Sequence, residues 1–177
     1  MARYYDPTSP LSKRGEEWEA KLLSNIQSAG WYAVDSWEYI TQIRPHFSNI
    51  QKAKITQRIG DILSKGSSSD YYFECVVCLH ENILANTPYD TGIFPVSKID
   101  NFKSQPEKSK EMWYAFLISS DGTGNNGEEI YIKAETWNAY ASKMPSKVVK
   151  GREYKLFKPS HLRGIVKSVS SFSQVIS

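Results

Sequence analysis

The sequence predicts an α/β or α+β domain in which helices flank a central mixed sheet. Two observations carry this prediction: strand-like segments alternate with segments of helical periodicity, and no internal repeat replaces that order. A length of 177 residues with 40% apolar residues is enough for one domain with a hydrophobic core. We expect an N-terminal arm over residues 1–12, the main domain over 13–160 and a C-terminal tail over 161–177.

The chain is predicted to begin its ordered part with one helix and one strand. Ser12 is a candidate helix cap, Gly30 marks the end, and apolar residues recur between them at helical spacing: Trp18, Leu22 and Ile26. The segment WYAVDSWEYI, residues 31–40, is rich in aromatic and branched side chains and predicts a strand.

Two further strands are predicted within ITQRIGDILSKGSSSDYYFECVVCL, residues 55–79, joined by a Gly/Ser turn. Residues 70–79 have the strongest strand signal in the chain, and Asp61 lies at the end of the preceding strand. Residues 41–54 are predicted as a polar connection.

The second half of the chain adds two helices and three strands. A loop over residues 80–95 leads into a helix that begins near residue 96, and Pro106 breaks or restarts that helix. The remaining predicted elements are a hairpin of strands at 113–119 and 129–134, a helix at 134–144 and a short strand at 154–157.

Cys75 and Cys78 form a C-x-x-C pair, a pattern that by itself suggests redox or zinc chemistry. Residues three apart on a strand point to opposite faces, however, and redox pairs normally begin a helix. A structural zinc site also needs further ligands, and the chain has no other cysteine. We interpret the two thiols as buried side chains that pack as small hydrophobes.

Glu74 lies in the middle of the strand predicted at 70–79, where a buried acid is costly unless it is paired or bound to a metal. The alternatives are a solvent-facing side chain on an edge strand or a pair with a core Arg or Lys. Asp61 lies thirteen residues earlier, and the predicted turn places the two carboxylates side by side. Two converging carboxylates bind a hard cation such as Mg²⁺, which activates water and stabilises charge on a phosphate under attack.

The motif GDI, a polar turn and a strand containing FEC resemble the PD-(D/E)xK nuclease superfamily. The segment KRGEEWEAKLL, with Glu19 four residues after a glycine, is similar to the opening of its Holliday-junction-resolvase-like members. The resemblance covers roughly residues 13–140 and implies a restriction-endonuclease-like fold, with Asp61 and Glu74 as the motif acids. It also implies Mg²⁺- or Mn²⁺-dependent hydrolysis of phosphodiester bonds in DNA, on branched or damaged structures, by a homodimer.

The chain departs from the superfamily pattern at two positions. Val76 stands where the pattern has a lysine, and Gly60 stands where it has a proline. Lys98 is our candidate for the missing lysine, with Lys54 and Lys65 as alternatives. The alternative function is a catalytically inactive, nuclease-like protein that binds nucleic acid or another partner.

The basic residues are unevenly distributed, although the net charge is only +3. Residues 143–167 contain eight Lys or Arg and a single acid, a distribution compatible with nucleic-acid contact or with a solvated surface. Near the predicted site we expect a set of side chains that contact phosphate, with ordinary surface charge as the alternative: Lys13, Arg14, Lys52, Lys54 and Arg58.

The chain has only short apolar runs, so we expect no membrane-spanning segment. Its first fifteen residues lack the apolar core of a signal peptide, and two cysteines without such a signal favour a reducing, cytoplasmic location. The expected partner is therefore nucleic acid, with DNA favoured, and no membrane.

Overall fold

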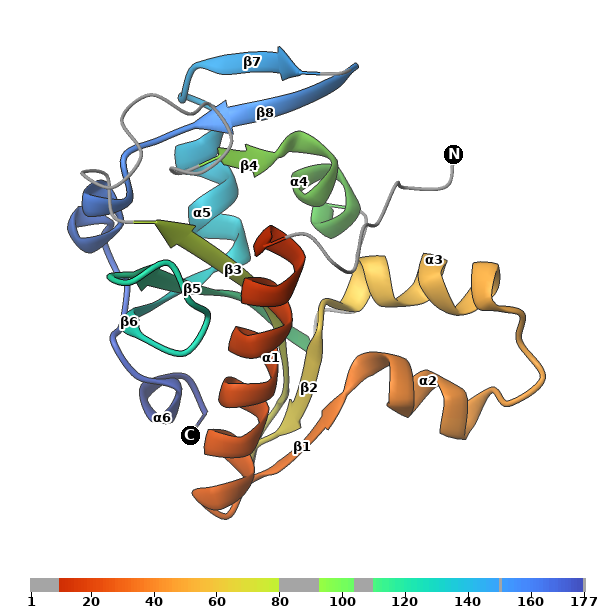
Figure 1. Cartoon of the computed structure of the whole chain (residues 1–177). Coiled ribbons are helices and arrows are strands. Elements are labelled where there is room, and N and C mark those ends of the chain that lie inside the picture. Colours follow the sequence, from red (N-terminus) through yellow and green to blue (C-terminus); the bar gives the residue numbers. More distant parts are fainter. Residues whose placement is uncertain (1–9, 80–92, 104–109, 150, 177) are drawn as a thin grey trace.

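Five strands form the main sheet of the protein (Figure 1). The structure is a computed structural model that describes residues 10–79, 93–103, 110–149 and 151–176. In sheet order the strands are β1 (Tyr32–Asp35), β2 (Ile62–Lys65), β3 (Asp70–Leu79), β5 (Lys110–Ser119) and β6 (Gly127–Lys133). The β3 and β5 strands are parallel and the other neighbours are antiparallel, so the sheet is mixed.

The other elements cover this sheet or form a smaller sheet at one end of the molecule (Figure 1). The small sheet has the strand order β4 (Ile93–Pro95), β8 (Arg152–Leu156) and β7 (Ser146–Val149). The helices are α1 (Pro10–Ser28), α2 (Ser36–Ile43), α3 (Asn49–Ile59), α4 (Val96–Lys103), α5 (Ala134–Ala141), the 3₁₀ helix η1 (Pro159–Gly164) and α6 (Phe172–Val175). The predicted fold class, a mixed sheet flanked by helices, is confirmed.

Each face of the main sheet has its own hydrophobic core. On one face, Trp18 and Leu22 of α1 pack against Phe73 of β3. On the other face, Trp137 of α5 packs against Phe116 of β5, with their ring centroids 4.9 Å apart. Because strand residues alternate between faces, β3 and β5 contribute side chains to both cores and lie at the centre of the molecule.

The N-terminal half contains more helix than the sequence predicted. The strand expected over 31–40 ends at Asp35, whose side chain accepts a hydrogen bond from the Glu38 N–H at 3.0 Å and begins α2. Residues 55–59, also expected to be strand, continue α3 after a capping box formed by Ser48 and Gln51. Asp61 therefore precedes β2 rather than ending it, and the predictions for 36–40 and 55–59 were wrong because local caps outweighed strand propensity.

The second half agrees more closely with the sequence. The strand predicted at 70–79 is confirmed residue for residue, and the predicted hairpin and helices correspond to β5, β6, α4 and α5. The strand predicted at 154–157 is β8, while β7 and η1 were not predicted. The loop expected over 80–95 lies largely outside the described residues, as does Pro106.

The segment predicted as a C-terminal tail contributes to both cores. Leu162 and Ile165 are buried on the α5 face, and Val175 and Ile176 are buried on the α1 face. A β-bridge also joins Val169 to the outer strand β6. These contacts hold residues 161–176 against the main domain.

None of the helices in the described part of the chain is long and apolar enough to span a lipid bilayer.

The turn between β5 and β6 fastens the first half of α1 to the sheet. The Gly124 N–H donates to Glu17 at 2.8 Å, and the Lys21 Nζ donates to the Asn125 carbonyl at 2.8 Å. The contact is close, because a Cβ atom added at Gly124 would lie 2.0 Å from the Arg14 carbonyl oxygen. These contacts hold α1 at Glu17 and Lys21, the positions on either side of Glu19 in the chain.

We expect Gly124→Ala to destabilise the protein by about 1–3 kcal/mol, because the added methyl group overpacks a backbone–backbone contact. Urea denaturation followed by circular dichroism measures this change. Gly15→Ala is the matched control, since its Cβ meets nothing within 4 Å and alanine favours the helix by about 0.5–1 kcal/mol. Equal stabilities of the two variants would contradict the importance of the Gly124 contact.

Candidate active site

Asp61 is positioned by the end of the β2–β3 pairing. Ile62 pairs with Phe73, so one further step of the antiparallel register places Asp61 opposite Glu74. The Asp61 N–H donates to the Phe73 carbonyl at 2.7 Å, and the Asp61 Oδ2 accepts from the Cys75 N–H at 2.8 Å. These two hydrogen bonds lie on either side of Glu74 in the chain and hold the two acids at the same level of the sheet.

Gly60 and Ser36 hold the backbone that leads into Asp61. Gly60 has a φ of 83°, and a Cβ atom there would lie 2.7 Å from the Phe73 carbonyl oxygen, so glycine is required on both grounds. Buried Ser36 donates from its hydroxyl to the Gly60 and Asp61 carbonyls and from its N–H to the Asp61 carbonyl at 2.9 Å. The requirement for glycine explains why no proline stands before Asp61.

Our sequence reasoning missed Ser36 because it placed this residue inside a strand. The signal that could have found it is the spacing of Asp35 and Glu38, an acid followed three residues later by another acid, which favours a helix start. With α2 beginning at Ser36, the serine backbone N–H and hydroxyl both point at the β2 entry.

Glu74 and Lys98 form an ion pair across the site. Glu74 is 8% exposed in the middle of β3, and Lys98 on α4 donates from its Nζ to Glu74 Oε1. The α4 helix is part of the connection between the parallel strands β3 and β5, and this crossover returns Lys98 to the sheet face that carries Glu74. Of the three lysines considered from the sequence, Lys98 is therefore the one paired with Glu74.

Glu19 completes a cluster of three carboxylates and one ammonium group. Burial raises the pKa of Glu19 to about 7, with repulsion from Glu74 as the second cause, while Lys98 acts in the opposite direction. Burial, followed by repulsion from Glu74 and Glu19, also raises the pKa of Asp61 well above its usual range. The four residues come from α1, the position just before β2, β3 and α4, so only the tertiary fold brings them together.

The donor set suits a hard cation because its charges are unbalanced. Three carboxylates face one ammonium group, and carboxylate oxygens are the ligands that Mg²⁺ and Mn²⁺ prefer. In the described residues no three His, Cys, Asp or Glu side chains converge closely enough to hold a metal ion as they stand. To bind an ion, Glu74 would have to exchange its contact with Lys98 for the metal. Asp61 would bind through Oδ1, because its Oδ2 accepts the hydrogen bond from the Cys75 N–H.

The five basic residues expected to contact phosphate fall into two groups. Lys13 and Arg14 lie in the first half of α1, and the other three lie on α3. Lys54 and Arg58 are exposed, whereas Lys52 is 8% exposed with its Nζ 5.9 Å from the centroid of the Trp37 ring. The α3 helix ends at Ile59, and Arg58 in its last turn is three residues before Asp61 in the chain.

The interpretation of the two cysteines as packing residues is confirmed. Cys75 belongs to the core on the α1 face and Cys78 to the core on the α5 face, and both thiols are free and buried. Burial raises the pKa of Cys78 to about 12 and that of Cys75 well above its usual range. Thiols with raised pKa values are poor nucleophiles and poor metal ligands at neutral pH.

No protein-family model matches the chain, and no curated protein is significantly similar to it in sequence.

The raised pKa of Glu19 predicts how stability depends on pH. Between about pH 4.5 and pH 7 the folded state binds the Glu19 proton more tightly than the unfolded state, so the free energy of unfolding falls as pH rises. We expect Glu19→Gln to reduce this fall by about 1–3 kcal/mol across that window. Urea denaturation at several pH values measures it.

Glu135→Gln is the matched control for this titration, because it removes one carboxyl group from an exposed position on α5. Its stability should fall with pH as that of the wild type does. A fall in Glu19→Gln as steep as in the wild type would show that the fold does not raise the pKa of Glu19.

Proposed function

We propose that the protein is a metal-dependent nuclease that hydrolyses phosphodiester bonds in DNA, including branched or damaged structures. The observation that carries this proposal is the meeting of Glu19, Asp61 and Glu74 beside Lys98 at one end of the β2–β3 pair. Such a cluster of like charges is costly to fold, and costly electrostatic arrangements are concentrated at functional sites.

The order of elements supports the resemblance to the PD-(D/E)xK superfamily. After the motif acid on β3 the chain forms β4 of the small sheet and then α4, β5, β6 and α5. Apart from β4, this is the helix, strand, strand, helix order expected of that superfamily. The acid of α1 approaches the two motif acids, as its assigned role requires. We therefore assign the chain a restriction-endonuclease-like fold as part of the proposal.

Each residue of the cluster has a distinct role in the proposed reaction. Asp61 and Glu74 would hold a Mg²⁺ or Mn²⁺ ion, which supplies an activated water and offsets charge on the phosphate. Lys98 lies beside Glu74, where its ammonium group can orient the attacking water and stabilise the charge that develops on the phosphate oxygens. Glu19 adds negative charge that favours cation uptake, and its pKa of about 7 allows it to exchange a proton near neutral pH.

The metal ligands are tested by Asp61→Asn and Glu74→Gln in a cleavage assay. The substrates are plasmid and branched DNA with Mg²⁺ or Mn²⁺, and product formation is followed on gels. We expect each variant to lose more than about 100-fold in rate, the upper end of the loss caused by changing groups around metal ligands. Glu135→Gln, an exposed acid on another helix, should cleave as the wild type does.

Two outcomes would decide against the proposal. Cleavage that persists in both Asp61→Asn and Glu74→Gln would remove the metal site. A wild-type protein that binds DNA without cleaving it would favour the alternative, a nuclease-like binding protein in which Lys98 permanently neutralises Glu74.

Lys98 has two roles in this proposal: it competes with the metal ion for Glu74, and it orients the attacking water. Lys98→Met tests both roles. Removing the ammonium group eliminates the cation that competes for Glu74, so we expect Mn²⁺ binding to tighten by about tenfold in isothermal titration calorimetry. Cleavage should nevertheless fall by about 100-fold or more, because water positioning is lost.

Lys65→Met is the control for Lys98→Met, because Lys65 on β2 was another lysine considered and lies over the Tyr32 ring instead. It should change neither metal binding nor cleavage. Parallel losses of metal binding and cleavage in Lys98→Met would show that this lysine only supports the fold of the site.

A further inference from the structure

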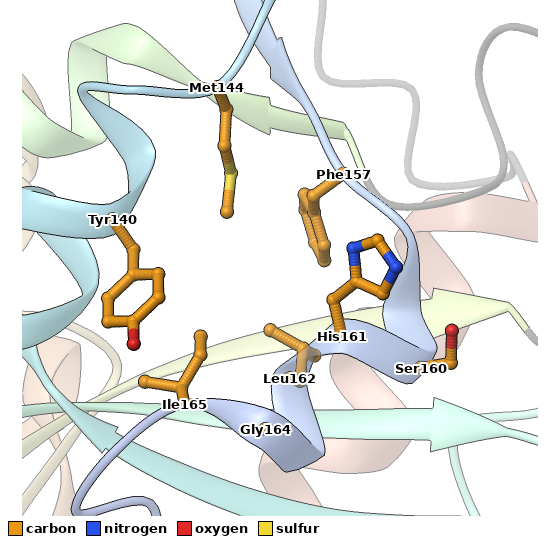
Figure 2. Close-up of a pocket in the computed structure, with 8 residues that line it drawn as sticks. All are labelled: Tyr140, Met144, Phe157, Ser160, His161, Leu162, Gly164 and Ile165. Carbon is orange, nitrogen blue, oxygen red and sulfur yellow. The ribbon is translucent and has the colours of Figure 1, made fainter.

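A cavity of about 400 Å³ opens between α5, the end of β8 and η1. Figure 2 shows the aromatic rings of Tyr140, Phe157 and His161 around this opening. Met144, Leu162 and Ile165 provide its apolar walls and floor. Phe157 also stacks edge-on against buried Trp137 with ring centroids 5.0 Å apart, so the cavity wall rests on the α5 core and is held rigidly.

The cavity has the size and the composition of a binding site for one planar group. Sites for small ligands have volumes of about 300–1,000 Å³ and combine apolar walls with a few polar atoms. Here the polar side-chain atoms are the Tyr140 and Ser160 hydroxyls and the His161 ring nitrogens, beside otherwise apolar walls. Tyr140 is 39% exposed, which leaves its ring accessible from solvent.

Basic residues are concentrated in the segment that supplies most of the cavity lining, and two of them directly neighbour lining residues in the chain. The described part of residues 143–167 contains seven Lys or Arg against one acid, Glu153. Lys143 precedes the lining residue Met144, and Lys158 follows Phe157 directly. Six of the seven are exposed, and one of these, Arg163, is paired with Glu128: Lys143, Lys147, Arg152, Lys158, Arg163 and Lys167.

We infer that this cavity is a docking site for an unpaired base of single-stranded DNA, with the surrounding lysines in contact with the flanking phosphates. Proteins that bind single strands combine a positive surface with aromatic side chains on which bases stack. Both features occur at this cavity. The positive charge of this segment is what selects a nucleic acid over an uncharged apolar ligand. The choice of DNA rests on the proposed function, whereas the cavity and its charges do not.

The site would give the protein a preference for DNA that is not fully paired. In a regular duplex the bases are stacked, and a base must be unpaired before its ring can enter a cavity. Branched or damaged DNA offers such bases at little cost. In this inference the carboxylate cluster cleaves the DNA, and the cavity, which is formed by a separate part of the chain, selects the substrate.

Gly164→Phe tests the cavity directly. Gly164 lines the cavity, and a Cβ atom added there meets nothing within 4 Å, so a large side chain can enter the space without displacing the backbone. We expect the variant to bind a fluorescent oligo(dT) about tenfold more weakly than the wild type, as the loss of one stacked base predicts. Fluorescence anisotropy with EDTA present measures binding of the full chain without cleavage.

Gly164→Ala is the matched control, because one methyl group leaves most of the cavity open and should leave affinity unchanged. Tyr140→Ala is a second test at the exposed rim, and it should also weaken binding. Circular dichroism and thermal unfolding establish that each variant is folded.

The charges are tested by changing Lys143 and Lys158 to alanine together. For single strands the logarithm of the affinity falls by about 0.7 per logarithmic unit of salt for each phosphate contact, so the double variant should reduce this slope by about 1.4. Lys65→Ala, a lysine on β2 outside the segment, should leave the slope as in the wild type.

Equal affinities of Gly164→Phe and the wild type for oligo(dT) would overturn the inference, as would no binding by the wild type. Loss of a dimer in Gly164→Phe, with oligo(dT) binding intact, would also overturn it and assign the cavity to a second copy of the chain. Failure of the nuclease proposal gives a different result: no cleavage with Mg²⁺, together with EDTA-insensitive binding that still depends on the cavity.

Discussion

The antiparallel pairing of β2 with β3 is the constraint on which the candidate active site depends. Because its register continues one residue beyond β2, it places Asp61 opposite Glu74, and the Phe73 carbonyl and the Cys75 N–H hold Asp61 there. A shift of this register by one residue would point the Glu74 side chain to the opposite face of the sheet, into the other hydrophobic core. The left-handed backbone at Gly60 allows the chain to leave α3 and join the sheet at that point.

The electrostatics of the cluster follow from that placement. Once Asp61 and Glu74 lie side by side in a largely buried position, the approach of Glu19 adds a third negative charge that the single ammonium group of Lys98 does not balance. Sequestering like charges from water raises the pKa values of Asp61 and Glu19 and reduces the stability of the folded state at neutral pH. A divalent cation held by these carboxylates, as proposed, would relieve this repulsion.

The carboxylate cluster and the segment from residue 143 to 167 differ in charge. Acidic side chains converge near Gly60, where α3 meets β2, whereas the region from residue 143 to 167 is basic and contains an aromatic-lined cavity. The parallel strands β3 and β5 connect both features, since β3 bears Glu74 and β5 bears Phe116, which packs with Trp137 and Phe157 behind the cavity. Glu74 pairs with Tyr114 and Val76 pairs with Phe116, so Glu74 and Phe116 point to the same face of the sheet. The proposed cleavage site and the inferred docking site are therefore both built on that face.

The sequence by itself determined the elements whose signals are local and strong. Alternating branched and aromatic residues predicted β3 to the residue, and the short turn before it predicted that Asp61 and Glu74 would be neighbours. The same reasoning mistook α2 for a strand, because Trp37 and Tyr39 favour strands while the cap at Asp35 decides for helix. Only the tertiary structure decided that Glu19 and Lys98 reach these acids. Glu19 is placed by the burial of Trp18 under the sheet, and Lys98 by the crossover between β3 and β5, and neither of these long-range packing contacts leaves a local pattern in the sequence.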